Sequence, residues 1–185
     1  MFSYRNSLLA YSLTALLMTT STEPRAGELV QFDGISADAG SLRLLGYLAR
    51  PRGPQAGPSP AIVILHHCAG FDDLVVSWAD RLSSWGYVAL AVDSFGPRRV
   101  PRNCTARTYQ AFDSSSALDF LAHQDFVDSG RVAVLGFSQG GTAALRNAEQ
   151  DSTLAKSHPD TFRAAVMMMP TSRRQVLAAS LLAAV

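Results

Sequence analysis

The stretch RVAVLGFSQGG at residues 131–141 decides the fold. Its first seven residues form a nearly continuous apolar run, the pattern of a strand that is buried on both faces of a parallel sheet. The sequence QGGTAALRNAEQ at 139–150 predicts a helix that begins directly after Ser138. A buried strand that leads straight into a helix is typical of an α/β protein. The pattern therefore predicts a strand, a tight turn at Ser138 and a helix.

The same alternation continues on both sides of this stretch. Further apolar runs predict buried strands at 61–67, 87–93 and 162–170. Helices are predicted at 72–86, where Asp72 or Asp73 begins the helix and Gly86 ends it, and at 108–124, with Ala111, Leu118 and Leu121 on one face. Residues 28–34 and 42–50 predict a hairpin. We therefore expect one domain at 27–170, a three-layer α/β/α sandwich with a mostly parallel sheet that lacks the last strand–helix units of its fold.

Length and composition limit the classes of protein. The chain has 185 residues, 48% of them hydrophobic and 17% charged, with a formal charge of +1. This balance gives no reason to expect nucleic acid or an anionic membrane as a partner. No run reaches the roughly 18 apolar residues of a membrane span. Two cysteines exclude a four-cysteine zinc site, and we expect neither a metal nor an organic cofactor.

The two ends differ from the predicted domain. Arg5 precedes a mostly apolar run at Leu8–Met18, which predicts a signal peptide at 1–26 and export to the periplasm or the medium. The alternative is an amphipathic helix packed on the domain. The tail at 171–185, TSRRQVLAASLLAAV, fits no continuation of the sheet, and we interpret it as aberrant or truncated.

The predicted turn carries the pattern G-x-S-x-G at 136–140. A serine between a strand and a helix, with small residues two before and two after it, is typical of a nucleophile elbow. Ser138 is therefore the candidate nucleophile, and the alternative is a structural serine in a glycine-rich turn. The oxyanion donors would be the backbone N–H of Gln139 and, from the loop at 66–70, the N–H of Cys68.

Four blocks of sequence resemble the dienelactone hydrolase family of α/β-hydrolases. They are LHHCAGF at 65–71, AVDSFGPR at 91–98, FVDSGRVAVLGFSQGG at 126–141 and FRAAV at 162–166. The resemblance implies hydrolysis of esters or small lactones by a nucleophile–His–Asp triad, with an acyl-serine intermediate here. It suggests Arg98 as a ligand for a substrate carboxylate, with a solvated loop arginine as the alternative.

The chain departs from this family at several positions. Many relatives have glycine where His67 and Ala69 stand, and the dienelactone-cleaving branch has a cysteine nucleophile and a glutamate in the first loop. This chain has Ser138 and His67 instead. His67 is therefore a second candidate substrate-binding residue, and the resemblance does not name the substrate.

The expected triad acid and histidine are missing from the predicted strand ends. Asp151, His158 and Asp160 follow Ser138 but precede the strand at 162–170, which places them at the wrong edge of the sheet. A substitute triad from His66 or His67 with Asp93 stays open. The leading hypothesis is a hydrolase impaired by truncation or a frameshift, and the alternatives are an inactive binding module or a non-functional fragment.

Two further expectations concern pairing. Cys68 and Cys104 follow neighbouring strands, so an oxidising compartment permits a disulfide between them, with two free thiols as the alternative.

The apolar strand at 162–170 would end the sheet, and an exposed edge of this kind predicts self-association.

Overall fold

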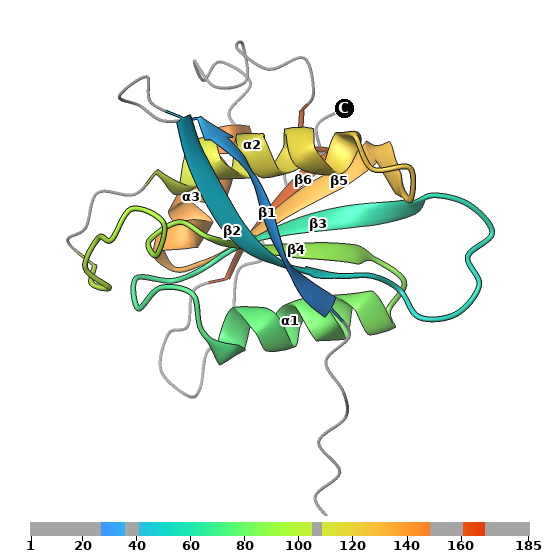
Figure 1. The fold of residues 1–185 in the computed structure, drawn as a ribbon, viewed down its shortest axis with the longest axis horizontal. Coiled ribbons are helices and arrows are strands. Elements are labelled where there is room, and N and C mark those ends of the chain that lie inside the picture. Colours follow the sequence, from blue (N-terminus) through green and yellow to red (C-terminus); the bar gives the residue numbers. More distant parts are fainter. Residues whose placement is uncertain (1–26, 36–40, 105–108, 149–160, 169–185) are drawn as a thin grey trace, which may run out of the picture.

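The computed structural model describes residues 27–35, 41–104, 109–148 and 161–168 (Figure 1). The strands are β1 (Gly27–Ile35), β2 (Ser41–Ala49), β3 (Ser59–Leu65), β4 (Val88–Asp93), β5 (Val127–Phe137) and β6 (Ala164–Met168). The helices are α1 (Asp73–Ser84), α2 (Gln110–Ala122) and α3 (Gln139–Ala148). The predicted signal peptide, the tail at 171–185, and Asp151, His158 and Asp160 lie outside the described residues. Export therefore stays a prediction.

The six strands form one mixed sheet in the order β1-β2-β4-β3-β5-β6. β1 and β2 form the expected antiparallel hairpin, and β2 pairs antiparallel with β4. β4, β3, β5 and β6 are mutually parallel. The carboxyl ends of these four strands consequently meet at one edge of the sheet, which is where ligand sites of α/β proteins lie.

Helices cover both faces of the sheet, as Figure 1 shows with α1 on one side and α2 and α3 on the other. Successive side chains of a strand point to opposite faces. Val63 and Leu65 accordingly pack in the core under α2 and α3, whereas Ile64 packs in the core under α1. The α/β sandwich expected from the sequence is confirmed.

Local signals explain where α1 begins and ends. The Asp72 carboxylate accepts a hydrogen bond from the Leu74 N–H at 3.1 Å, so Asp72, one of the two residues considered from the sequence, is the N-cap. After the last helical residue, Gly86 has a φ of 94°, a left-handed conformation that glycine adopts without steric cost.

One predicted strand is less buried than expected. β6 is shorter than the apolar run at 162–170, and only Ala165 within it is fully buried, while Val166, Met167 and Met168 are partly exposed. The reason is its place at the end of the described sheet, where it pairs with β5 alone among the described strands. Self-association through this edge stays a prediction, which sedimentation velocity over a range of concentrations tests.

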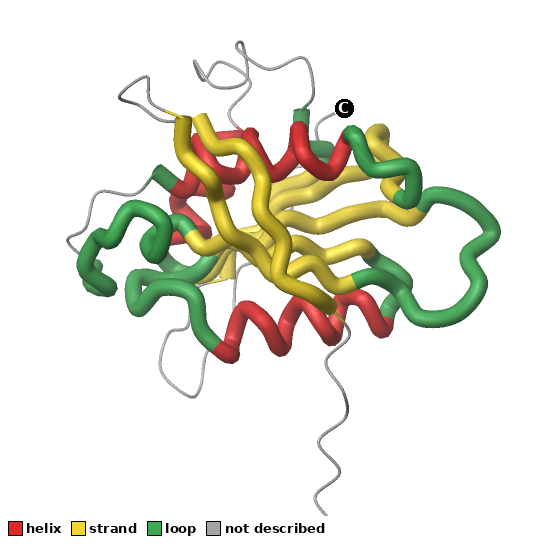
Figure 2. The backbone as a smooth tube through the Cα atoms, in the orientation of Figure 1, coloured by secondary structure: helices red, strands yellow, loops and turns green. Residues whose placement is uncertain are grey.

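The loops divide between the two ends of the sheet (Figure 2). The β3–α1 loop (residues 66–72) and the β4 loop (residues 94–104) lie side by side at the carboxyl ends of the parallel strands, while residues 50–58 form a long loop at the opposite end. No helix among the described residues is long and apolar enough to cross a membrane.

Candidate active site

Ser138 occupies the single residue between β5 and α3. Its φ is 51°, a left-handed conformation that is uncommon for a residue with a side chain. The Ser138 N–H donates to the Met168 carbonyl of β6 at 2.8 Å, and its carbonyl accepts from the Thr142 N–H at 3.1 Å. The serine backbone is therefore held by the neighbouring strand on one side and by the first turn of α3 on the other.

Two glycines make this turn possible. A Cβ on Gly136 would collide with the carbonyl of Gly140. A Cβ on Gly140 would lie 2.6 Å from the carbonyl oxygens of Leu65 and His66, at the end of β3. The sequence predicts small residues at both positions, and the reason is this close approach. It also means that the β3–α1 loop starts directly against the first turn of α3.

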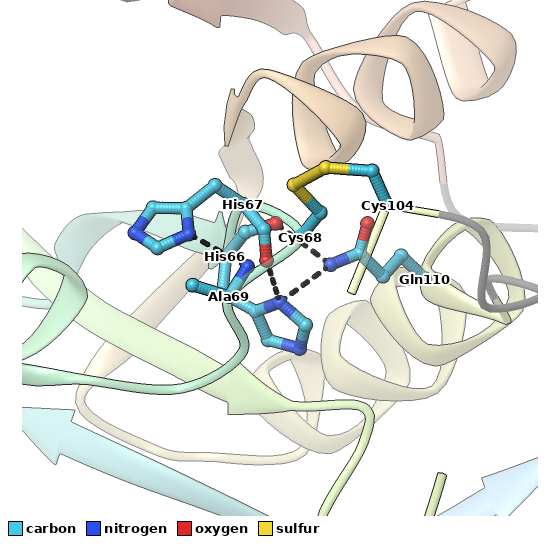
Figure 3. Close-up of a disulfide and its surroundings, with 6 residues drawn as sticks. All are labelled: His66, His67, Cys68, Ala69, Cys104 and Gln110. Atoms are coloured by element: carbon cyan, nitrogen blue, oxygen red, sulfur yellow. Dashed lines mark hydrogen bonds between the residues drawn. A yellow bond between two sulfur atoms is a disulfide. The ribbon is translucent and has the colours of Figure 1, made fainter. Parts of the chain in front are cut away.

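His67 organises the middle of the β3–α1 loop (Figure 3). Its Nδ1 accepts a hydrogen bond from the Ala69 N–H at 3.0 Å, so in neutral His67 the proton lies on Nε2. Nε2 is 3.1 Å from Oδ2 of Asp72, the residue that caps α1. Both ring nitrogens thus bind the protein itself, and His67 connects the loop to the start of α1.

His66 points into the core and is fully buried. Its Nε2 accepts from the Ser94 N–H at 3.3 Å, which leaves the proton on Nδ1, and Nδ1 donates to the His67 carbonyl at 2.7 Å. Burial lowers the pKa of His66 below 6.5, because the charged imidazolium loses its hydration. His66 is therefore a neutral structural group.

Gln110, the first residue of α2, holds His66 from the other side. It is fully buried, and its Nε2 donates to the His66 carbonyl at 2.8 Å (Figure 3). The same amide nitrogen lies 3.0 Å from Nδ1 of His66. This contact joins the start of α2 to the start of the β3–α1 loop.

Cys68 and Cys104 form a disulfide in the structure, which connects the β3–α1 loop to the β4 loop (Figure 3). Their strands β3 and β4 are neighbours, as the sequence predicts. Close to the disulfide, the side chain of Arg102 lies over Gly70, such that a Cβ on that glycine would be 3.1 Å from Cγ and Cδ of Arg102. The two loops are consequently in contact over several residues.

The family resemblance suggests Arg98 as a ligand for a substrate carboxylate, with a solvated loop arginine as the alternative. In the structure it forms an ion pair with Asp113. Its NH1 and NH2 donate to the two carboxylate oxygens of Asp113 at 2.8 and 2.6 Å, and NH1 also donates to the Ser94 carbonyl at 3.0 Å. The Arg98 side chain is only 11% exposed, so the alternative of a solvated loop arginine is wrong. Its guanidinium stacks on Tyr109, with 4.6 Å between Cζ and the ring centroid. Three of its five N–H groups serve this internal network, and contact with a substrate carboxylate stays a prediction.

Burial raises the pKa of Asp113 above its ordinary value, and the hydrogen bonds from Arg98 act in the opposite direction. Sequence reasoning missed both Asp113 and Gln110. A signal for them exists in the sequence. Gln110 and Asp113 share one face of the helix with Ala117 and Leu121, which are apolar and buried, so burial of the two polar residues could have been expected.

No hydrogen bond joins the Ser138 hydroxyl to a histidine within the described part of the chain. Asp93, the acid considered for a substitute triad, instead accepts from the N–H groups of Phe95 and Gly96. The remaining described histidine, His123, follows α2 at the end away from Gln110. The structure therefore does not assemble the substitute triad from His66, His67 and Asp93.

Comparison of the sequence with known protein families gives a match over residues 44–178. The matched region includes the turn at Ser138 and the β3–α1 loop. The chain belongs to the dienelactone hydrolase family. The resemblance stated from the sequence blocks is thereby confirmed.

Individual relatives agree with this assignment. A Bradyrhizobium protein named "Probable 2-oxo-3-(5-oxofuran-2-ylidene)propanoate lactonase" is 28% identical over 131 residues, which cover 65% of this chain and 52% of that protein. Lipase 1 of Moraxella is 27% identical over 99 residues, covering 54% of this chain and 30% of the lipase. The chain thus spans about half the length of the lactonase and less than a third of the lipase. The family and these relatives support a hydrolase.

A solved structure shows the same fold at lower identity. The structure of esterase Est22 with p-nitrophenol superimposes with a TM-score of 0.58 and 15% identity, over 76% of this chain and 43% of the esterase. At this identity the likeness concerns the fold alone.

Proposed function

We propose that this chain carries the nucleophile and the oxyanion donors of a hydrolase that cleaves carboxylic esters or small lactones through an acyl-serine. The observation that supports this most strongly is the left-handed Ser138 at the carboxyl end of β5, one residue before α3. This turn projects the hydroxyl from the strand end toward the edge where α/β proteins bind ligands. The half-buried position of Ser138 keeps the hydroxyl within reach of a small substrate.

The oxyanion donors in this proposal are the backbone N–H groups of Gln139 and Cys68. Gln139 is the first residue of α3, where the helix dipole favours negative charge. In the β3–α1 loop, the N–H groups of Ala69 and Gly70 both donate to His67. The Cys68 N–H, in contrast, donates to no described residue, which leaves it available to a developing oxyanion.

In the reaction, the Ser138 hydroxyl would attack the acyl carbon and pass its proton to solvent water as the carbonyl oxygen gains negative charge. The two N–H groups would stabilise that charge. The C–O bond of the ester would then break, and the alkoxide would take a proton from water and leave as the alcohol, after which a second water would release the acid and restore the serine hydroxyl. No metal ion or organic cofactor enters these steps.

We further propose that turnover by this chain is slow. A serine without a general base is a weak nucleophile. Among the histidines that the structure describes, both ring nitrogens of His66 and of His67 are hydrogen-bonded within the protein, and His123 follows the far end of α2, so none of the three is placed to take the Ser138 proton. Oxyanion donors and binding alone still leave a residual acceleration of about 10³ to 10⁴ over water.

The test is covalent labelling with a fluorophosphonate, with and without added imidazole as an external base. We expect slow labelling of the wild-type chain that imidazole accelerates, and none of Ser138→Ala. Ser84→Ala is the matched control, because Ser84 is an exposed serine at the end of α1, and it should label like the wild type.

Either of two results would overturn the proposal. Labelling that persists in Ser138→Ala would place the reactive group elsewhere. A folded wild-type chain that does not label even with imidazole would indicate a binding module instead of an enzyme. Fast labelling that imidazole leaves unchanged would retain the nucleophile but contradict slow turnover, since a base would then already serve Ser138.

A further inference from the structure

We propose that the Cys68–Cys104 disulfide and Gln110 are positioning elements that hold the β3–α1 loop against the first turn of α3. Through the loop they would fix the Cys68 N–H relative to Ser138. The assignment of that N–H as an oxyanion donor rests on the proposed function, whereas the restraint of the loop does not.

The covalent part of this restraint joins segments that are distant in sequence. Cys68 and Cys104 are 36 positions apart, and their Cα atoms lie 4.7 Å from each other. Cys68 follows the pair His66 and His67 directly, so the bond acts at the middle of the loop. Arg102, two residues before Cys104, adds a second contact by lying over Gly70.

The non-covalent part acts at the start of the loop. The buried Gln110 amide donates to the His66 carbonyl at 2.8 Å, and the same carbonyl is one of the two oxygens against which Gly140 packs. The end of β3 is therefore held between α2 and α3. Since Gln110 is 44 positions from His66, this restraint, like the disulfide, depends on the folded sheet.

The loop needs such support because its own hydrogen bonds are few. Within it, the Ala69 and Gly70 N–H groups both bind His67, and His67 reaches Asp72. These contacts fix the shape of the loop but do not connect it to α3. Segments with few such connections open locally without unfolding of the whole domain. An oxyanion donor acts only when it lies within hydrogen-bond distance of the developing charge, so its position must be restrained from outside the loop.

The test is hydrogen–deuterium exchange followed by mass spectrometry of the full chain. The samples are the oxidised protein, the protein reduced with dithiothreitol, Cys104→Ser and Gln110→Ala. Dithiothreitol supplies two electrons and two protons to the Cys68–Cys104 bond and becomes its own cyclic disulfide. Gln124→Ala is the matched control, because Gln124 binds the Phe120 carbonyl at the other end of α2.

We expect the amides of residues 66–72 to exchange about tenfold faster after reduction, in Cys104→Ser and in Gln110→Ala. Peptides from β4 and β5 should exchange faster only by the factor that the loss of global stability, measured by urea unfolding, accounts for, and Gln124→Ala should match the wild type throughout. In the fluorophosphonate assay with imidazole, reduction should lower the maximal labelling rate and leave the concentration for half-maximal labelling unchanged.

Three results would overturn the inference. Unchanged exchange of residues 66–72 after reduction would show that the disulfide does not restrain the loop. Acceleration of residues 66–72 that is fully accounted for by the loss of global stability measured by urea unfolding would show that the bond stabilises the domain as a whole without a local role. Alkylation of two free thiols in the unreduced, denatured protein would show that the bond is absent. None of these depends on Ser138 labelling, so failure of the proposed function is recognised separately.

Discussion

Ser138 adopts a backbone conformation that favours glycine, and this has a measurable cost. A left-handed conformation costs a residue with a Cβ about 1 kcal/mol or more, whereas glycine adopts it freely. Ser138→Gly and Ser138→Ala both remove the hydroxyl, but only the glycine variant removes the strain. We therefore expect Ser138→Gly to be about 1 kcal/mol more stable to urea than Ser138→Ala.

The corresponding pair at Ser84 is the control for this comparison. Ser84 ends α1, where its hydroxyl donates to the Arg81 carbonyl. In a helix alanine is favoured over glycine by up to about 1 kcal/mol. Ser84→Gly should consequently be less stable than Ser84→Ala, the reverse of the order at Ser138. An alanine variant at 138 that equals or exceeds the glycine variant would contradict the assigned strain.

His66 predicts a dependence of stability on pH. Burial lowers its pKa in the folded state below the 6.5 of an exposed histidine, although the Asp93 and Asp72 carboxylates act against this. Between the folded pKa and about 6.5, the unfolded chain therefore binds more protons than the folded one. Stability should be complete above pH 6.5 and fall as the pH is lowered below it, by at most about 1.4 kcal/mol per pH unit.

Urea unfolding at pH 7.5 and 5.5 measures this effect. His66→Gln should be less stable than the wild type at pH 7.5 and should lose less stability on acidification. His123→Gln is the control, because that side chain is 75% exposed, and it should keep the pH dependence of the wild type. A wild-type curve that is flat or rises toward pH 5.5 would show that His66 is not held neutral.

For single residues, the sequence predicts features that depend on neighbouring positions, but it does not predict contacts between residues that are far apart in the chain. The turn at Ser138 follows from five consecutive residues, G-x-S-x-G, placed after an apolar run. The partners of His66 and Arg98 do not follow in this way, because Gln110 and Asp113 are 44 and 15 positions away from them. Only the folded sheet and the helix α2 bring these groups together.

Among the helices and strands, α2 buries polar as well as apolar side chains. Its buried face carries Gln110, Asp113, Ser114 and Ser115 as well as apolar residues. Asn147 of α3 donates to the Ala111 carbonyl at 3.1 Å and to the Ser114 hydroxyl, so the contact between the two helices is partly polar. A search for apolar periodicity places this helix correctly but cannot assign these partners.

The Arg98–Asp113 pair connects the β4 loop to α2, and we expect its loss to destabilise the domain. Arg98→Met would leave the fully buried Asp113 without its counter-charge, which costs about 3 to 5 kcal/mol. The double variant Arg98→Met/Asp113→Leu should recover much of this loss, because no unpaired charge then remains. Urea unfolding at pH 7.5 measures both variants.

Arg131→Met provides the comparison for an exposed pair. Arg131 and Asp128 form an ion pair on the surface, and solvent screening should leave its removal without a measurable effect on stability. If Arg98→Met instead kept full stability and weakened only substrate binding, Arg98 would be the substrate ligand that the family resemblance suggests.

For the whole molecule, the order of strands and helices could be predicted because each parallel strand is a distinct apolar run. Runs at 61–67, 87–93 and 131–137 correspond to β3, β4 and β5 within a few residues. The apolar run at 162–170 alone predicts a fully buried strand, whereas the expected place of this strand at the end of the sheet accounts for the partial exposure of β6. That property depends on the arrangement of the sheet and not on the residues of one strand.

The disulfide is the covalent contact between distant parts of the described molecule, and it should contribute to global stability as well. In the chain-entropy view, closing a loop of 36 positions removes freedom from the unfolded state worth about 4 kcal/mol. We expect reduced protein to unfold at a lower urea concentration than oxidised protein. Cys104→Ser should resemble the reduced wild type and should not respond to dithiothreitol.

The disulfide has two proposed roles, to stabilise the whole domain and to restrain the β3–α1 loop. Comparing the urea midpoint with amide exchange of residues 66–72 distinguishes these roles. Exchange in β4 and β5 under native conditions reports opening of the sheet, whereas exchange at 66–72 reports opening of the loop alone. If the bond acts mainly through the unfolded state, reduction changes the urea midpoint and leaves native exchange of the loop unchanged. If it also positions the loop, both quantities change, and exchange of the loop rises by more than the loss of global stability accounts for, whereas exchange of the sheet does not. A urea midpoint that is identical with and without reductant would contradict the contribution to global stability.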